Sequence, residues 1–418
     1  MTIHKSVIYV TKSTEPSTTA NMIKTITSIL LLSPALLFSQ TWEEVSSMPV
    51  GKHHPVTFSI DGKGYAVSGT NPSGLPTDDV FQYDPVANQW SELNAFPGVD
   101  RSFAIGQTYN GKGYLGFGTS LTAFLRDIWE YDATTDTWSL LTTCDCAARR
   151  HPAFIIKEDK IYVGLGNDAN GDLDDWHIYD MISDTWTQVD DMPGNGRHHP
   201  FMFPAGDHVY AGMGHSGQTI YDDWYKFNIT TAMWETMADF PGESRVAGTQ
   251  FGHQGKGYVL SGDGSNHNFM QTGEFWEYEP ELDTWSELDP HPGISRWAPG
   301  SFVINGAVYF LAGQNRQTGA ILNDLWTYQL SEPSSIGEVD NSMQVKMYPN
   351  PTTGILNIKN QFEGNSAITI SNMSGQLVYQ TTLSTTDATI NLTDLESGIY
   401  TVSIESSNTI IRKKLIVQ

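Results

Sequence analysis

A basic side chain stands eleven residues after most of the evenly spaced tryptophans of this sequence, and ten residues after the first of them. The set is Lys52, Arg101, Arg149, Arg197, Arg245 and Arg296. Guanidinium and ammonium groups that gather at one place attract carboxylates and sulfates. The series therefore predicts an anion-binding ring at the mouth of a channel, if the fold brings these six positions together. The alternative is that each cation only bonds carbonyl groups of its own loop.

Histidines accompany this basic series. His54, His151 and His199 each precede a proline and follow a basic position by two residues, and His53 and His198 directly precede two of them. Neutral imidazole is a common ligand of transition metals. The first three are therefore a candidate metal site unless the ring holds them too far apart, in which case they line the channel as polar groups. His53 and His198 are candidate ligand-binding residues.

The segment NDANGDLDD is a second metal candidate. Asp168, Asn170, Asp172 and Asp174 place an oxygen ligand at every second residue of a turning loop, which is how calcium is caged in proteins. The glycine stands at the fourth loop position and no glutamate closes the loop, so the pattern is not that of an EF-hand. Calcium binding and an acidic, solvated loop both remain open.

Internal repeats of the sequence indicate which structural elements hold these basic, histidine and acidic residues. One series is Trp42, Trp90, Trp138, Trp186, Trp234 and Trp285, spaced by 48 or 51 residues. A second is Tyr65, Tyr114, Tyr162, Tyr210, Tyr258 and Tyr309, each followed four residues later by glycine. A third places an acid four residues before an aromatic, and its acids are Asp79, Asp127, Asp175, Asp223, Glu274 and Asp324. Three series in one register predict six units.

Each unit has the sequence of four short strands. Turns such as DGKGY and NGKGY join the first two strands, and alternation in WEYD and WTYQ places aromatics on one face of the third. One such sheet cannot bury both faces, so we expect the units to stack around an axis as blades. The sixth unit stops at Leu330 without its tryptophan strand, and residues 41–49 are predicted to supply it from the other end of the chain.

These units resemble kelch repeats, on the spaced tyrosine and tryptophan, although only the last glycine of the usual pair is constant. The resemblance implies an all-β, six-bladed β-propeller over residues 41–330, closed by the N-terminal strand.

A different module follows a Ser/Pro/acidic linker at residues 331–344. Its alternating strands predict a small Ig-like β-sandwich at residues 345–418. It resembles the type A C-terminal sorting domain of the Bacteroidetes type IX secretion system, with Tyr348, Pro349, Asn350, Pro351 and Gly354 as the sorting motif. The resemblance implies handling by that machinery, removal of the domain, and release or attachment at the cell surface. A carbohydrate-binding or adhesive sandwich is the alternative.

Residues 1–39 are predicted to be a pre-sequence and signal peptide, with the true start at Met22. Lys24, an apolar run from Ile26 to Phe38 and Ser39 match a secretory signal, and the run is too short to span a membrane. We expect Sec export through the periplasm to the outer-membrane surface or the exterior, with no transmembrane segment in the mature chain.

Charge and cysteines limit the function further. The net charge is −24, and removal of residues 1–39, which carry +2, leaves −26, so nucleic acid is not an expected partner. Cys144 and Cys146 cannot form a disulfide framework, and their C-x-C spacing is predicted to be too short for an easy bridge.

The preferred interpretation is a secreted binding module for a glycan or protein. Two enzyme classes share the kelch resemblance. A galactose-oxidase-like copper enzyme would need a tyrosine crosslinked to a cysteine. An acidic-sugar isomerase or mutarotase similar to N-acetylneuraminate epimerase would use the basic ring for a carboxylate and His53, His198 or Glu243 to move protons. No cofactor follows from the sequence with certainty beyond the calcium candidate.

Overall fold

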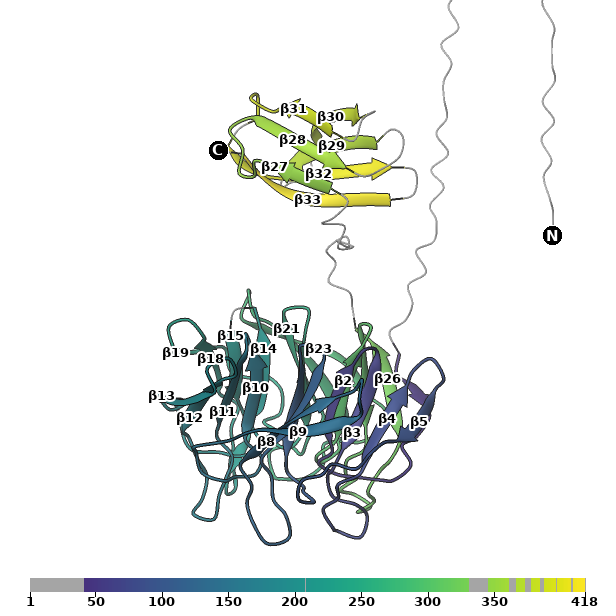
Figure 1. Cartoon of the computed structure of the whole chain (residues 1–418), viewed down its shortest axis with the longest axis vertical. Coiled ribbons are helices and arrows are strands. Elements are labelled where there is room, and N and C mark those ends of the chain that lie inside the picture. Colours follow the sequence, from purple (N-terminus) through teal and green to yellow (C-terminus); the bar gives the residue numbers. More distant parts are fainter. Residues whose placement is uncertain are drawn as a thin grey trace, which may run out of the picture. The chain divides into compact units, whose positions relative to one another are not determined.

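The computed structural model describes residues 41–206, 208–330, 345–360, 366–372, 377–383, 387–395, 397–406 and 409–417 (Figure 1). The described residues form β-strands and loops and contain no helix. The all-β class predicted from the sequence is therefore confirmed. The predictions for residues 1–39 and 331–344 lie outside the described residues.

Four-stranded antiparallel sheets make up residues 41–330. The first sheet holds β2 (Val56–Ile60), β3 (Lys63–Val67), β4 (Val80–Asp84) and β5 (Gln89–Glu92). The second holds β6 (Ile105–Tyr109), β7 (Lys112–Gly116), β8 (Asp127–Asp132) and β9 (Thr137–Thr143). The third holds β10 (Ala153–Lys157), β11 (Lys160–Gly164), β12 (Trp176–Asp180) and β13 (Thr185–Val189).

Three further sheets repeat this order. The fourth holds β14 (Phe201–Ala205), β15 (His208–Gly212), β18 (Trp224–Asn228) and β19 (Met233–Thr236), with the small hairpin β16 (His215–Ser216) and β17 (Thr219–Ile220) between β15 and β18. The fifth holds β20 (Thr249–His253), β21 (Lys256–Leu260), β22 (Gly273–Glu279) and β23 (Thr284–His291). The sixth holds β24 (Gly300–Ile304), β25 (Ala307–Leu311), β26 (Leu325–Gln329) and β1 (Glu43–Val45).

The sheets follow one another in a closed cycle. The first strand of each sheet contacts the first strand of the next, and β24 of the sixth sheet contacts β2 of the first. Strand β1 pairs antiparallel with β26, with Glu44 opposite Trp326. The prediction that residues near the N-terminal end complete the sixth sheet is thus confirmed.

The repeated aromatic residues hold adjacent sheets together. In the second sheet Tyr131 pairs with Trp138 across β8 and β9, with ring centroids 4.7 Å apart. Tyr131 also lies 5.7 Å from Tyr65 of the first sheet. The tyrosine and tryptophan series therefore recur because each sheet buries the same face against its neighbour.

The turn between the first two strands also follows the sequence. Asp61 and Gly62 have φ angles of 48° and 73°, and Asn110 and Gly111 have 46° and 73°. Two successive positive φ angles define the type I′ hairpin turn that Asp-Gly and Asn-Gly favour.

The cysteine prediction is wrong. Cys144 and Cys146 form a disulfide with their Cα atoms 5.1 Å apart, inside the range of roughly 4.4–6.8 Å that a bridge requires. Both residues are buried in a cluster with Phe117 and Phe154. The loop after β9 bends sharply enough to bring two cysteines separated by one residue within bonding distance.

The C-terminal residues form two sheets around their own core. One sheet holds β27 (Val345–Tyr348), β28 (Ile355–Asn360) and β31 (Asp387–Asn391). The other holds β30 (Leu377–Leu383), β29 (Ser366–Asn372), β32 (Gly398–Ser406) and β33 (Thr409–Val417). Leu356 and Ile390 of the first sheet share one buried cluster with Ile368, Val402 and Leu415 of the second.

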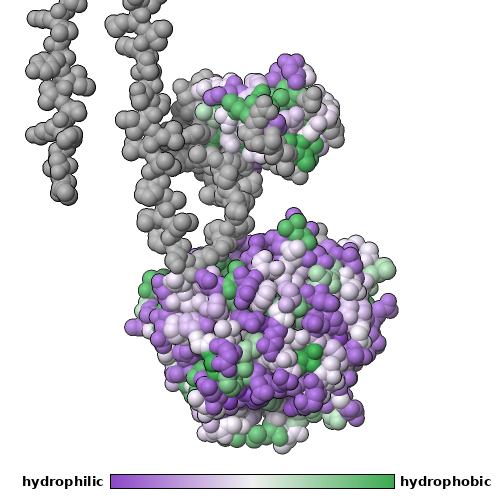
Figure 2. All heavy atoms as spheres, turned by 180° about the vertical axis from the view of Figure 1, so that it is seen from behind, coloured by the Kyte–Doolittle hydropathy of each residue, from purple (hydrophilic) through white to green (hydrophobic). Residues whose placement is uncertain are grey.

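The visible surface of the 41–330 body is mostly hydrophilic, with hydrophobic residues scattered over it (Figure 2). Several of the most exposed, such as Val86 and Ile182, lie in turns between the third and fourth strands of a sheet. Single exposed hydrophobic residues of this kind are normal on soluble domains.

Candidate functional site

The six basic residues of the repeat lie inside the protein. The side chains of Lys52, Arg101, Arg149, Arg197 and Arg245 have no exposed area and that of Arg296 has 6%. Arg101 shows the pattern: its Nη1 and Nη2 donate to Asp127 Oδ1 and Oδ2 at 2.9 and 2.7 Å, and Nη1 also donates to the carbonyl of Phe117. The basic series thus pairs with the acidic series of the same repeats. The partners are Asp79, Asp127, Asp175, Asp223, Glu274 and Asp324.

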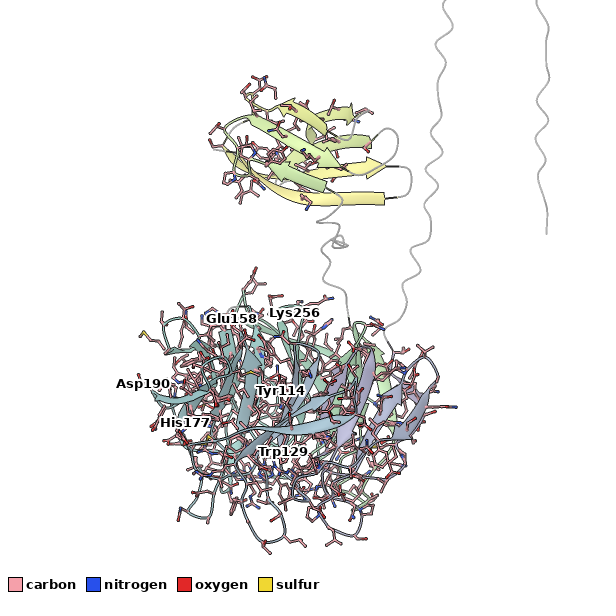
Figure 3. All side chains as sticks on the ribbon, viewed as in Figure 1. Tyr114, Trp129, Glu158, His177, Asp190 and Lys256 are labelled. Atoms are coloured by element: carbon pink, nitrogen blue, oxygen red, sulfur yellow. A yellow bond between two sulfur atoms is a disulfide. The ribbon has the colours of Figure 1, made fainter. Side chains whose placement is uncertain are left out.

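These ion pairs overturn the placement of the anion-binding ring. A ligand at the channel mouth cannot reach a guanidinium group that is fully buried and already held by a carboxylate and a carbonyl. The residue two positions after the acid can add to the pair from the third strand. Trp129 Nε1 and His177 Nε2 bond the carboxylates of Asp127 and Asp175, and both side chains are labelled in Figure 3. Each of the six cations therefore links the loop before the first strand of its sheet to the start of the third strand.

The residues two positions after each cation turn toward the centre of the cycle. They are His54, Phe103, His151, His199, Ala247 and Ala298, with φ between 50° and 58°. Their backbones bond one another from sheet to sheet, as when His54 N donates to the carbonyl of Ala298 and His151 N to that of Phe103. Side chains at left-handed backbone positions are uncommon, although histidine tolerates them better than most residues.

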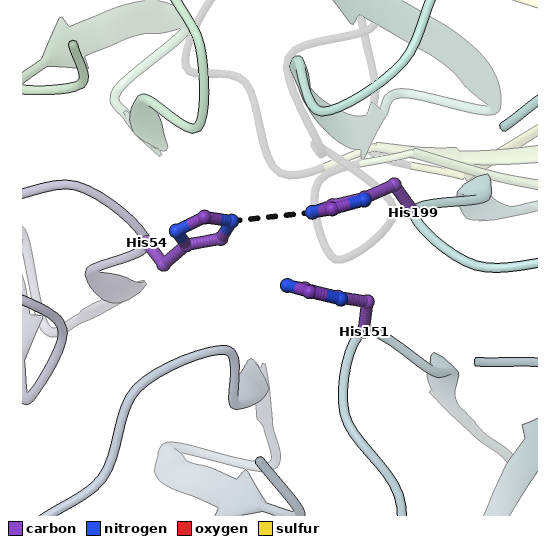
Figure 4. A group of neighbouring side chains, drawn as sticks. All are labelled: His54, His151 and His199. Atoms are coloured by element: carbon purple, nitrogen blue, oxygen red, sulfur yellow. Dashed lines mark hydrogen bonds between the residues drawn. The ribbon is translucent and has the colours of Figure 1, made fainter. Parts of the chain in front are cut away.

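Three of these side chains converge. The imidazoles of His54, His151 and His199 project from separate loops into one opening (Figure 4). His54 Nε2 lies 3.2 Å from His199 Nε2, and the rings of His151 and His199 stack with centroids 3.5 Å apart. One ligand atom from each lies within 4.8 Å of the others. The ring is therefore narrow enough for these residues to meet, which the sequence left open.

A cavity of about 350 Å³ lies beside these histidines. Its lining is formed by Phe103, Arg150, His151, His198, His199, His215, Val246, Asp263, His267, Trp297 and Arg316. Arg150 lies over the ring of Phe103, with its Cζ 5.7 Å from the centroid, and Arg316 lies over Trp297 at 5.4 Å. Neither arginine was predicted as a site residue from the sequence, because neither belongs to the basic series.

The positions of Arg150, His215 and Asp263 follow a pattern that recurs in the repeats. In each unit, the residue after the repeated glycine forms a β-bridge with the residue after the cation, as in His198 with His215 and Val246 with Asp263. Gly214 makes this approach possible: it has φ of 75°, and a Cβ there would lie 2.7 Å from the carbonyl oxygen of His198. Aligning these two positions across the six units would have identified Arg150, His215 and Asp263 but not Arg316, which stands at neither position.

Burial controls the charge of the cavity groups. It lowers the pKa of His53 and His215 to about 4, and that of His54, His151 and His199 also lies well below the ordinary value. Burial likewise raises the pKa of Asp263 to about 6, although Arg316, whose Nε lies 3.1 Å from its Oδ2, acts in the opposite direction. At neutral pH these five histidines are thus uncharged, the arginines carry positive charge, and Asp263 is mostly ionised.

The remaining predicted residues occupy other places. His53 packs against Trp297, with ring centroids 4.9 Å apart, and His198 lines the cavity. Glu243 does not line it, because its Oε1 accepts hydrogen bonds from the backbone N and Oγ of Ser265.

The acidic loop does not have the arrangement of a calcium cage. Asp168 Oδ1 accepts hydrogen bonds from the backbone N of Asn170 and Gly171, which closes the turn. Asp172 Oδ1 lies 2.6 Å from His198 Nδ1. In the part of the chain that the structure describes, the side-chain groups close enough to share a metal consist of histidines and include neither Asp168, Asp172 nor Asp174. The predicted oxygens are thus engaged in local bonds or lie apart.

Comparison with known proteins agrees with this architecture. The family model of the attractin/LZTR1 β-propeller matches residues 64–326. The chain belongs to the attractin/LZTR1 β-propeller family. The model of the secretion system C-terminal sorting domain matches residues 346–418. An F-box/kelch-repeat protein of Arabidopsis thaliana is 40% identical over 63 residues, which are 14% of this chain and 16% of the relative.

The sorting domain supports export of this propeller to the cell surface or the extracellular space. Its predicted motif connects the two ends of the domain. Asn350 Oδ1 accepts a hydrogen bond from the backbone N of Ile416 at 2.9 Å, and Thr352 N donates to the carbonyl of the same residue. Gly354 has φ of 123°, and a Cβ there would lie 2.6 Å from Thr393 Cγ2. In the described part of the chain, no helix has the length and apolar character needed to cross a membrane.

Proposed function

We propose that this protein is a secreted six-bladed β-propeller that binds a carboxylated glycan at the mouth of its channel. The observation that carries the proposal is the cavity in which two arginines lie over aromatic rings. A pocket of a few hundred Å³ that combines flat apolar surfaces with a few polar groups is typical of small-ligand sites. Sugar rings pack on aromatic faces, and guanidinium groups form paired hydrogen bonds with carboxylates.

The charge of the cavity favours an acidic ligand. Arg150 Nε donates to Asn167 Oδ1 at 3.0 Å, a neutral partner that leaves its charge uncompensated by that bond. Arg316 pairs with Asp263, with its Nε 3.1 Å from Oδ2, and because the pKa of Asp263 is about 6 this carboxylate still compensates most of the charge of Arg316 at neutral pH. On a protein of net charge −24, the positive charge of Arg150 at this cavity creates a local field that attracts anions.

A glycan array followed by thermal-shift titration tests this function. We expect an acidic glycan to raise the melting temperature of the full chain, and the shift to vanish in Arg150→Ala and Arg316→Ala. Lys226→Ala is the matched control, because Lys226 pairs with Glu235 and does not line the cavity. Binding that survives both arginine substitutions would reject this site.

An acidic-sugar isomerase or mutarotase is the second candidate. It is favoured by the contact of His198 Nδ1 with Asp172 Oδ1, because a carboxylate that holds one imidazole nitrogen leaves the other oriented for proton transfer. Exchange at the anomeric proton of sialic acid, followed by NMR, tests it, and no acceleration by the purified protein would eliminate it. A galactose-oxidase-like reaction has no support, because Cys144 and Cys146 are bonded to each other.

The domain organisation belongs to the same proposal. The cycle of four-stranded sheets over residues 41–330 supports six blades, and the two sheets around one core support an Ig-like sandwich at residues 345–418. We further propose that residues 331–344 are a linker, and that residues 1–39 direct Sec export in a Bacteroidetes cell. The type IX machinery then delivers the propeller, released or attached to the surface. Secretion of tagged full-length protein by a type IX-competent bacterium tests this route.

A further inference from the structure

The cavity contains a second group of three histidines, formed by His198, His199 and His215. One nitrogen from each lies within 4.8 Å of the others, and His199 Nδ1 is 3.3 Å from His215 Nε2. Four ligands placed tetrahedrally about 2.0–2.1 Å from a zinc ion are separated from one another by about 3.3 Å. The separation of these two nitrogens is therefore that of two ligands of one ion.

Each of the three rings has a partner for its other nitrogen. His198 Nδ1 lies 2.6 Å from Asp172 Oδ1, and His215 Nδ1 lies 3.2 Å from the carbonyl oxygen of Gly217. Both oxygens accept only, so each ring is protonated at Nδ1 and keeps the lone pair on Nε2. A histidine that binds a metal almost always donates its other N–H in this way, to a carboxylate or a carbonyl.

The third ring, that of His199, has a partner for its other nitrogen in His54, which in turn contacts His53. His199 Nε2 lies 3.2 Å from His54 Nε2, and His54 Nδ1 lies 2.8 Å from His53 Nδ1. If His199 donates from Nε2 and His54 from Nδ1, every bond in this chain has one donor and one acceptor. The lone pair of His199 is then on Nδ1, on the side of His215.

We propose that His198, His199 and His215 bind one divalent transition-metal ion of the zinc class, with an open coordination position toward the cavity. Three neutral imidazoles with a free fourth position form the ligand set of catalytic and ligand-binding zinc sites. All three residues line the cavity. Asp172, Gly217 and His54 are positioning groups that orient the rings.

The group of His54, His151 and His199 fits a metal less well. Both ring nitrogens of His151 are buried without a hydrogen-bond partner, so this ring lacks the outer partner that a ligand histidine has. His199 takes part in both groups, and a neutral imidazole has one lone pair to give. The partners of the rings therefore favour the group that contains His215.

Metal titration of the full chain tests the assignment without reference to any glycan. After dialysis against a chelator, we expect one zinc ion to bind per chain, measured by calorimetry and by elemental analysis. Cobalt in place of zinc should give the visible absorption of a tetrahedral ion. His198→Ala and His215→Ala should each weaken zinc binding by about 100-fold or more, and Asp172→Asn by about 10–100-fold.

His151→Ala is the matched control, because it removes a histidine of the same cavity that belongs to the other group. It should bind zinc like the unsubstituted chain. Thermal melting of each variant without metal shows whether it is folded, and His215→Gln offers a second variant if His215→Ala is not. Absence of zinc binding, or loss in His151→Ala with retention in His215→Ala, would overturn the proposal. Failure of the glycan proposal would leave these results unchanged.

Discussion

At the scale of single residues, adjacent positions of one repeat have opposite roles. Arg149 is fully buried and bonds Asp175 through both Nη atoms, at 2.5 and 2.7 Å, whereas Arg150 lines the cavity. Both carry the same charge, and the sequence alone ranked the buried one as the ligand-binding residue. The acidic series, 26 residues further along in this unit, was the evidence that the cation already had a partner within the fold.

This contrast predicts different effects for the same substitution. Arg149→Ala leaves Asp175 without its main counterion, and removal of one partner of a buried ion pair costs about 3–5 kcal/mol. Arg150→Ala removes a cavity side chain and should change the free energy of unfolding by less than about 1 kcal/mol. Urea denaturation measures both values. Equal free energies of unfolding for the two variants would show that the buried cations do not stabilise the sheets.

The same ion pairs predict how acid unfolds the protein. Burial alone would raise the pKa of Asp127, but the hydrogen bonds and the charge of Arg101 outweigh it and lower that pKa below its ordinary value of 3.8. A carboxyl group with a lowered pKa in the folded state contributes its full stability above the unfolded value, and loses it as the pH falls through the folded value. The denaturation midpoint should therefore fall below about pH 4.

Asp127→Asn provides the comparison for this acid effect. It removes the titrating group, so its stability at neutral pH should be lower and its further loss in acid smaller. Denaturation curves at several pH values compare the two proteins. An acid dependence as steep in Asp127→Asn as in the unsubstituted chain would assign the effect to other carboxyl groups.

At the scale of elements, the sequence predicts strands and turns well because the same pattern recurs in six repeats. The hairpin at Asp61 and Gly62, the pairing of Tyr131 with Trp138, and the strand near Glu43 all follow from local patterns. The sequence does not determine the distances between side chains that face one another across the centre of the cycle. The meeting of His54 with His199 depends on the positive φ of both residues and on the radius that the packed sheets impose.

Removal of strand β1 tests whether this strand stabilises the cycle of sheets. Trp42, just before it, packs against Tyr328 of β26 and donates from Nε1 to the carbonyl of Asp289. Deletion of residues 41–48 exposes the edge of β26 and removes the strand through which the chain links the sixth sheet to the first, so we expect a lower melting temperature and a broader transition. Calorimetry measures both.

A peptide can restore the missing strand in this experiment. Added residues 41–49 should pair with β26 and return part of the melting temperature, since a ligand that binds only the folded state stabilises it. A peptide of the same composition in scrambled order is the control. An unchanged transition after the deletion would mean that β1 does not close the cycle.

At the scale of the whole molecule, the propeller and the sorting domain have separate cores. The buried cluster of the C-terminal sheets consists of residues from Leu356 to Val417, and the clusters of the propeller contain residues up to Leu330. A family match of its own covers each part. Stability and export should therefore depend on different residues.

Deletion of residues 346–418 should separate these two properties. The shortened chain should keep the melting temperature of the propeller, because no residue of its buried clusters is lost. In a bacterium with a type IX secretion system it should accumulate in the periplasm, whereas the full chain should reach the surface or the medium. Gly354→Val, which places a branched side chain against Thr393, should show the same export defect with an intact propeller. Export of either variant at the level of the full chain would mean that the fold of this domain is not what the machinery recognises.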